Sequence, residues 1–258
     1  NAICDHYLPT GINSVVPKKP VSIAVAVIDK IDTLVGFFGI NEKPTSSKDP
    51  FALRRTAIGL LRIIIENKLS FQLKDLINYS IILYEEQNKK FVNESTVKEV
   101  LFFLKERFKN ILKEKNIRSD IIEAIDDSHI NYDFLSVYKK CKIINKNISR
   151  EMFKNIVSIY KRASNIIYDE RKDNKFEIFE QPESSLFKKD EEKILFDKIR
   201  EIRNYFSTTI KAENYEDTLK MLAGAKPAMD NFFDNVIVND ENIDIKKNRL
   251  SLIKMFCN

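Results

Sequence analysis

Histidine and cysteine are scarce in this chain of 258 residues, and that scarcity excludes several kinds of active site. The only histidines are His6 and His129, so a serine or cysteine nucleophile would lack a credible general base. Cys4, Cys141 and Cys257 are far apart and form no Cys-x-x-Cys pair, which argues against a disulfide framework and against a thiolate zinc site. We therefore expect no catalytic residue in this chain and a reducing compartment, the cytoplasm.

Long apolar runs, glycine-rich loops and low-complexity segments are also missing. No apolar run reaches the roughly 18 residues that a transmembrane helix needs. Five glycines and seven prolines are few, and neither a Gly-x-Gly-x-x-Gly motif nor a phosphate loop occurs. We therefore expect neither a membrane partner nor a cofactor bound by this chain.

Apolar residues recur at helical spacing over nearly the whole chain. Together with capping residues, this spacing predicts helices over 20–38, 50–66, 70–84, 95–115, 119–126, 132–145, 149–168, 184–211 and 214–224, from 227 onward, and over 244–256. The stretch 169–183 loses the period and is predicted to be an extended excursion between helices. No strand alternation competes, so the sequence predicts an all-α fold.

One of these helices joins a start signal to a basic flank. Asp49 can cap the helix and Pro50 can occupy its first position. The apolar residues that follow form a broad stripe of helical period, and Arg54, Arg55 and Arg62 lie largely outside it. Physical chemistry alone predicts a core helix with a cationic side.

Positive charge is concentrated in one segment of the chain. The net charge is only +5, but residues 139–162 hold eight basic side chains against the single acid Glu151, a local charge of +7. Such a block indicates an anionic partner, because neutralising phosphates releases counterions from a nucleic acid. A solvated, lysine-rich helix face is the alternative.

Three ordered motifs resemble one protein family. The segment 48–55, Lys-Asp-Pro-Phe-Ala-Leu-Arg-Arg, resembles a signature of the bacterial glycyl-tRNA synthetase β-subunit family. Upstream, 5–9 and 28–40 resemble the end of the HD-like helical domain of that family. Downstream, 229–238 and the Asn-Arg-Leu motif at 248–250 are similar to the DALR-type anticodon-binding domain that several synthetases share.

The resemblance implies a domain organisation and a place in a larger protein. Residues 1–68 would be the end of the HD-like domain, 69–148 a helical connector, and 149–258 the DALR-type domain. The family's β subunit is much longer than this chain, which begins without methionine, so we expect a fragment.

The resemblance also implies a function. The chain would be the tRNA-binding part of the β subunit of a heterotetrameric α2β2 glycine–tRNA ligase. It would bind and position tRNA(Gly) for aminoacylation in the α subunit, where the whole enzyme uses ATP with Mg. The chain by itself would not be catalytic.

Candidate RNA contacts follow from the charge pattern and from this resemblance. A helical anticodon-binding domain combines phosphate contacts with surfaces on which unpaired bases stack. The residues that match these needs are Arg54, Arg55, Lys154, Lys161, Arg162, Asn165, Phe232, Lys246, Lys247 and Arg249. Lys161, Arg162 and Asn165 also resemble a Lys-Arg-x-x-Asn motif that precedes the DALR-type domain in the family.

Several of these candidates have structural alternatives. Arg54 and Arg55 can instead join neighbouring helices by ion pairs. Phe232 can belong to the core, and Arg249 can be the ion-pair partner of Asp230 or Asp234.

Two other functions remain open at the level of sequence. An HD-type metal phosphohydrolase would need a full ligand set, and only His6, Asp29 and Asp32 resemble metal ligands here. We therefore expect no metal site. A purely structural scaffold for subunit assembly is the second alternative.

Overall fold

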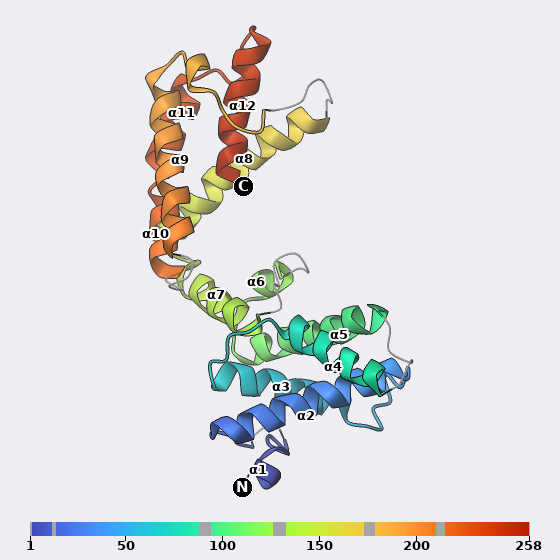
Figure 1. Cartoon of the computed structure of the whole chain (residues 1–258). Coiled ribbons are helices and arrows are strands. Elements are labelled where there is room, and N and C mark those ends of the chain that lie inside the picture. The colour runs from blue at the N-terminus through green and yellow to red at the C-terminus, as the bar shows by residue number, and fades with distance from the viewer. Residues whose placement is uncertain are drawn as a thin grey trace. The chain divides into compact units, whose positions relative to one another are not determined.

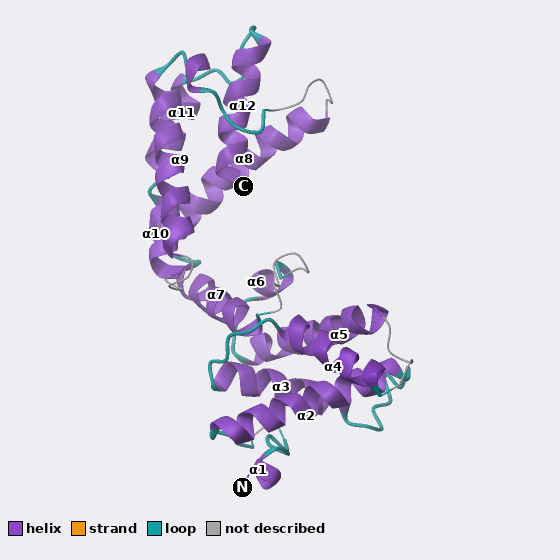
Figure 2. Cartoon of the chain, in the orientation of Figure 1, coloured by secondary structure: helices purple, strands orange, loops and turns teal. Residues whose placement is uncertain are grey.

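The computed structural model describes residues 2–11, 14–87, 94–125, 133–172, 179–209 and 215–257. These residues form helices joined by loops and turns, and none of them lies in a strand (Figure 2). The predicted all-α fold is therefore confirmed. The chain divides into two compact units, Asn1–Asn145 and Lys146–Asn258, which we call the first and second units. The predicted division into 1–68, 69–148 and 149–258 stays a prediction.

The first unit is a helical bundle built around one long helix (Figure 1). Its helices are α1 (Ala2–Asp5), α2 (Pro20–Gly39), α3 (Leu53–Glu66), α4 (Leu73–Glu86), α5 (Glu94–Glu114), α6 (Ser119–Glu123) and all but the last two residues of α7 (Phe134–Asn147). Helix α2 packs against α1, α3, α4 and α5. The fully buried side chains Leu34, Leu60 and Leu104 come from α2, α3 and α5, so these three helices share one core. Phe134 at the start of α7 meets Phe108 of α5 edge to face, with ring centroids 5.1 Å apart.

The basic helix begins later than its sequence predicts. Asp49 does satisfy the first amides, since its carboxylate accepts hydrogen bonds from the backbone N of Leu53 at 2.8 Å and of Arg54 at 3.0 Å. The prediction that Pro50 opens the helix is wrong. Residue Ala52 adopts a left-handed conformation with φ of 52°, which separates the turn at Pro50 from the helix that starts at Leu53.

The second unit packs its helices around another core. Its elements are α8 (Glu151–Lys172), the 3₁₀ turn η1 (Ser184–Leu186), α9 (Asp190–Thr209), α10 (Tyr215–Ala223), α11 (Lys226–Asn235) and α12 (Ile243–Cys257). Helix α8 packs against α10, α11 and α12, and α9 packs against α11 and α12. The buried residues that share this core are Ile159, Ala163, Ile167, Leu195, Ile199, Ile202, Ala225, Met229, Phe232, Val236, Leu250, Leu252 and Ile253.

The region between α8 and α9 differs from its prediction in two ways. Helix α8 continues to Lys172, so the prediction that the helix ends by residue 169 is wrong. The single helix predicted over 184–211 is instead η1 followed by α9. The carboxylate of Glu192 accepts hydrogen bonds from the backbone N of Lys188 at 2.7 Å and of Lys189 at 2.8 Å, and so caps α9 at that point.

Within the described ranges, no helix combines the length and the apolar character that crossing a membrane requires.

Tyr84 gives the first unit a pH-dependent contribution to stability. Burial, and next the nearby charge of Asp32, raise the pKa of Tyr84 from 10.0 to about 12. Because the folded state holds this proton more tightly than the unfolded state, the contribution is complete below pH 10 and is lost as the pH rises towards 12. The wild type should therefore lose stability relative to Tyr84→Phe as the pH is raised from about 9 to about 11 in urea unfolding experiments. Parallel profiles for the two proteins would contradict this prediction.

Candidate nucleic-acid interface

The outward side of α8 carries the predicted phosphate contacts. Ile159, Ala163 and Ile167 lie in the core, whereas Lys154, Lys161, Arg162 and Asn165 are exposed. The helical period explains this division, since residues three, four and seven positions apart share one side of a helix. We call these four exposed residues the α8 stripe.

Arg162 is oriented by an aromatic ring from another helix. Its guanidinium carbon lies 4.2 Å from the ring centroid of Phe233 in α11, and this half-buried ring packs against the core. A guanidinium stacked on a ring through its flat face keeps the N–H groups of its edge available for a phosphate. Within the described part of the chain these N–H groups have no hydrogen-bond partner.

The other members of the α8 stripe are also available. Lys161 and Asn165 have no hydrogen-bond or ion-pair partner among the residues that the structure describes. The Nζ of Lys154 lies 3.9 Å from a carboxylate oxygen of Glu151, and both side chains are strongly exposed. An ion pair of this kind is weak in water, so a phosphate can compete for Lys154.

Phe232 is not an exposed stacking surface. Its exposed fraction is 0%, and its ring meets that of Phe233 edge to face with centroids 5.5 Å apart. A base cannot stack on a ring that is enclosed by the core. The structural alternative is therefore correct for Phe232, and the more accessible of the two rings is that of Phe233, on which Arg162 lies.

Arg249 is a structural residue, although not with the predicted partners. It is 4% exposed, and its Nε donates to an oxygen of Glu192 at 2.9 Å. Its Nη1 donates to Asp240 at 2.6 Å and to the carbonyl oxygen of Ile237 at 2.8 Å. An ion pair with Asp230 or Asp234 was the wrong prediction, because sequence spacing along α11 says nothing about a partner 57 residues away in α9.

The residue before Arg249 has a related role. The side-chain oxygen of Asn248 accepts a hydrogen bond from the backbone N of Glu183 at 2.7 Å, and its amide donates to the carbonyl oxygen of Glu183 at 3.0 Å. The Asn-Arg motif thus binds the segment before α9 to α12. The side-chain groups of Asn248 that these bonds use are thereby engaged within the second unit.

The two lysines of α12 are less available than their positions in sequence indicate. The Nζ of Lys246 lies 3.0 Å from a carboxylate oxygen of Glu170 in α8, and both side chains are largely buried. The Nζ of Lys247 lies 5.8 Å from the ring centroid of Phe179. The charge of Lys246 is therefore already compensated, and α8 offers the stronger cationic surface.

In the first unit the arginines of α3 divide into structural and available side chains. Arg54 donates to the carbonyl oxygen of Thr45 and lies 3.7 Å from a carboxylate oxygen of Asp49. Arg62 donates to the carbonyl oxygen of Ser14 at 2.8 Å and also pairs with Glu66. Both arginines therefore fix loops to α3.

Arg55 differs from these two arginines. It is exposed, and in the described part of the chain it has neither a hydrogen-bond nor an ion-pair partner. It lines two cavities that Pro9 and Thr10 also line, of about 430 and about 260 Å³. Arg55 is the candidate in this unit that can contact a phosphate without first losing an internal partner.

His6, one of the three HD-like candidates, is engaged in hydrogen bonds within the first unit. The Nδ1 of His6 donates to the carbonyl oxygen of Ile3 at 2.6 Å, and the carbonyl oxygen of His6 accepts a hydrogen bond from the buried Nζ of Lys30 at 2.9 Å. Burial lowers the pKa of Lys30. In the described ranges, no three His, Cys, Asp or Glu side chains lie close enough together to hold a metal ion.

Sequence reasoning missed a group of basic residues on α9. Lys193 and Arg200 line a cavity with Phe187 and Phe196. The signal was present, since Lys193 and Arg200 are seven residues apart and so lie on one side of a helix, with an aromatic residue between them. The second ring was hidden, because in one continuous helix over 184–211 Phe187 would lie on the opposite side from Phe196.

Comparisons with known proteins agree with the resemblance drawn from the motifs. The family model described as glycyl-tRNA synthetase beta subunit matches residues 1–127, and the DALR anticodon binding domain matches residues 156–258. A relative from Rickettsia canadensis, a glycine–tRNA ligase beta subunit, is 40% identical over 256 residues, which are 99% of this chain and 36% of the relative.

Proteins of the same name from two further organisms are also similar. The relative from Clostridioides difficile is 32% identical over 98% of this chain and 35% of its own length. The relative from Persephonella marina is 33% identical over 100% of this chain and 37% of its own length. The chain thus spans just over a third of the length of these relatives. Its two family matches follow each other in the order that the motifs predict, and the chain belongs to the glycyl-tRNA synthetase β-subunit family.

Proposed function

We propose that this chain is the tRNA-binding part of the β subunit of a glycine–tRNA ligase. It binds tRNA(Gly) and positions it for ATP-dependent aminoacylation, which takes place in the α subunit of a cytoplasmic α2β2 enzyme. Its relatives are named as glycine–tRNA ligase β subunits, and a DALR anticodon binding domain matches the second unit.

The α8 stripe is the observation that carries this proposal. It combines a stacked guanidinium, two lysines and an amide on one side of a helix. Cations on a fixed helix fit the phosphates of RNA, and an exposed amide fits a sugar or a base edge. The chain would thus contribute binding energy and orientation to the reaction, while ATP and Mg act elsewhere in the whole enzyme.

Replacing the two central cations of the α8 stripe should weaken tRNA binding. The double variant Lys161→Ala/Arg162→Ala is expected to bind tRNA(Gly) about tenfold more weakly at moderate salt, because two phosphate contacts are lost. The slope of log affinity against log salt should also fall by about 1 for each lost contact. Both quantities can be measured by fluorescence anisotropy with the 258-residue chain across a salt series.

A matched control distinguishes the contribution of the α8 stripe to tRNA binding from the contribution of net charge. Lys198→Ala/Lys220→Ala removes the same charge from the same unit, but both lysines are paired on the surface, with Glu201 and Asp217. This control should bind tRNA(Gly) almost as the wild type does. Equal losses in the two double variants would mean that only the net charge matters, and an unchanged affinity of Lys161→Ala/Arg162→Ala would overturn the assignment of the stripe.

Three RNAs test what the chain recognises. Weaker binding of an anticodon-swapped tRNA(Gly) than of tRNA(Gly) would support specific reading by the second unit. Equal and steeply salt-dependent binding of both and of an unrelated tRNA would support a module that reads phosphates only. No binding of any of the three would overturn the proposal in favour of an assembly scaffold.

A further inference from the structure

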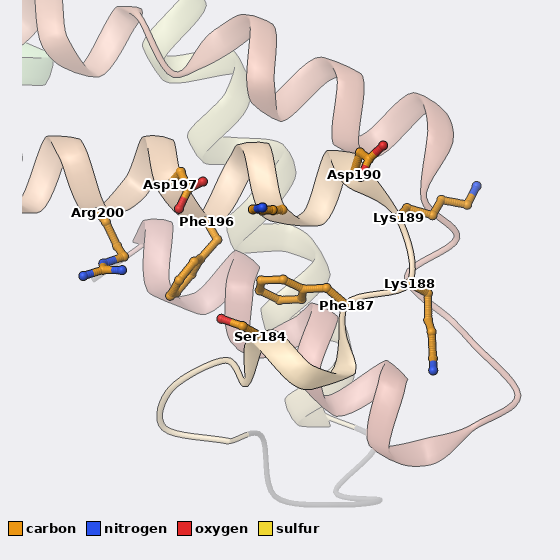
Figure 3. Close-up of a pocket in the computed structure, with 9 residues that line it drawn as sticks. Ser184, Phe187, Lys188, Lys189, Asp190, Phe196, Asp197 and Arg200 are labelled. Carbon is orange, nitrogen blue, oxygen red and sulfur yellow. The ribbon is translucent and has the colours of Figure 1, made fainter.

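A cavity of about 440 Å³ lies between η1 and the first turns of α9 (Figure 3), and no residue of the α8 stripe lines it. We call it the η1–α9 pocket. It is within the range of volumes that small-molecule ligands occupy in proteins. Its walls combine two aromatic rings with several charged side chains.

The aromatic wall consists of Phe187 and Phe196. Their ring centroids are 5.6 Å apart and their planes meet at 64°, an edge-to-face arrangement. Both rings are half-buried, and Phe196 also packs against the core of the second unit. Figure 3 shows the two rings next to each other at the cavity, with the side chain of Ser184 beside them. Flat aromatic surfaces of this kind suit the faces of a planar ligand.

The charged wall has more cations than carboxylates. Lys193 and Arg200 stand on the exposed side of α9, and the guanidinium carbon of Arg200 lies 5.6 Å from the ring centroid of Phe196. Lys188 and Lys189 also line the pocket, although the Nζ of Lys189 donates a hydrogen bond to the carbonyl oxygen of Asn235 at the end of α11.

Two carboxylates complete the pocket. They belong to Asp190 and Asp197, and neither has an ion-pair partner within the described ranges. Four basic side chains against two acidic ones leave a positive local charge.

Hydrogen bonds from two buried side chains, Asn248 and Glu192, hold the pocket in shape. Asn248 binds both backbone groups of Glu183, immediately before η1. Glu192 binds the backbone N of Lys188 and of Lys189, between η1 and α9, and pairs with Arg249. Because the segment that forms the pocket is already fixed on both sides, binding a ligand costs little conformational entropy.

We propose that the η1–α9 pocket binds one unpaired nucleotide of the RNA held by the second unit. The base lies against Phe187 and Phe196, and Lys193 and Arg200 bind a neighbouring phosphate. This assignment rests on the proposed function. A nucleotide of single-stranded RNA unites a flat base with an anion, whereas a base inside a duplex is stacked and paired and cannot enter.

Two RNAs of equal length and composition test the assignment with the 258-residue chain: a hairpin with an unpaired loop and a fully paired duplex. The variants are Phe187→Ala and Lys193→Ala/Arg200→Ala, with Lys198→Ala/Lys220→Ala as the control of equal charge. The pocket variants should lose about tenfold or more in affinity for the hairpin and little for the duplex. The α8 double variant should lose affinity for both RNAs.

The outcomes separate this assignment from the proposed function. If the pocket variants bind the hairpin as the wild type does while the α8 double variant is weakened, the pocket assignment is overturned and the proposed function stands. If the pocket variants lose equal affinity for the hairpin and for the duplex, the pocket does not distinguish unpaired from paired RNA, and the nucleotide assignment is again overturned. If the wild type binds neither RNA, both proposals fail. Circular dichroism of each variant confirms that the helices are intact.

Discussion

Replacing Arg249 by methionine is expected to lower the free energy of unfolding of the second unit by about 3–5 kcal/mol, the range for breaking a buried ion pair. The loss arises because Glu192, whose exposed fraction is 0%, would keep its charge in the core without the guanidinium that compensates it. Methionine fills a similar volume, so the effect reports the lost charge and hydrogen bonds rather than a cavity.

The same substitution removes two further contacts of the guanidinium. Arg249 also binds the carbonyl oxygen of Ile237 and a carboxylate oxygen of Asp240. The backbone N of Asn242, and next the guanidinium of Arg249, lower the pKa of Asp240. The loop between α11 and α12 should therefore loosen together with the start of α9.

The measurement is urea unfolding followed by circular dichroism, because the chain has no tryptophan for fluorescence. Hydrogen exchange at peptide resolution then assigns the change to one unit. Peptides from the second unit should exchange faster in Arg249→Met, and those from the first unit should not change. Lys220→Ala, which breaks an exposed pair with Asp217, is the control and should unfold like the wild type.

A double variant tests the cause of the loss. In Glu192→Gln/Arg249→Met the buried charge is gone, so part of the lost stability should return. An Arg249→Met protein that unfolds like the wild type would contradict the ion-pair explanation. So would a double variant whose loss of stability equals the sum of the losses in the two single variants.

Phe232→Ala is expected to destabilise the second unit by about 3–5 kcal/mol, the usual cost of removing a phenylalanine from a core. Phe232 is fully buried with residues of α8, α9 and α12, so its removal leaves a cavity that these helices cannot easily fill. The measurement is again urea unfolding by circular dichroism. Because the ring is enclosed, the fraction of Phe232→Ala that remains folded should bind RNA as the wild type does.

Phe233→Ala is the matched comparison on the same helix. Its ring is only half-buried and lies beneath the guanidinium of Arg162. This variant should lose less stability than Phe232→Ala but more RNA affinity, because Arg162 loses the surface that orients it. A stable Phe232→Ala protein with weak RNA binding would reverse the assignment of the two rings.

Local chemistry made several features of this protein predictable. The helical period separates Ile159, Ala163 and Ile167 from Lys161 and Asn165 in α8, because a helix turns by the same angle at every residue. The carboxylate of Asp49 reaches the first amides of α3 from nearby in the chain, so its capping role was also predictable. The exact start of the helix was not, since Ala52 has a left-handed conformation that alanine seldom adopts.

By itself, the sequence determined the all-α class, the positions of most helices, the cationic side of α8 and the family, since all of these depend on residues close in sequence or on motifs in order. The tertiary structure decided that Phe232 is buried and Phe233 is less so, and that Arg54 has an internal ion-pair partner while Arg55 has none among the described residues. It also decided that Arg249 pairs with Glu192 and that η1 and α9 enclose the η1–α9 pocket. Burial and ion pairing join residues tens of positions apart, and only the packing of the helices brings such residues together.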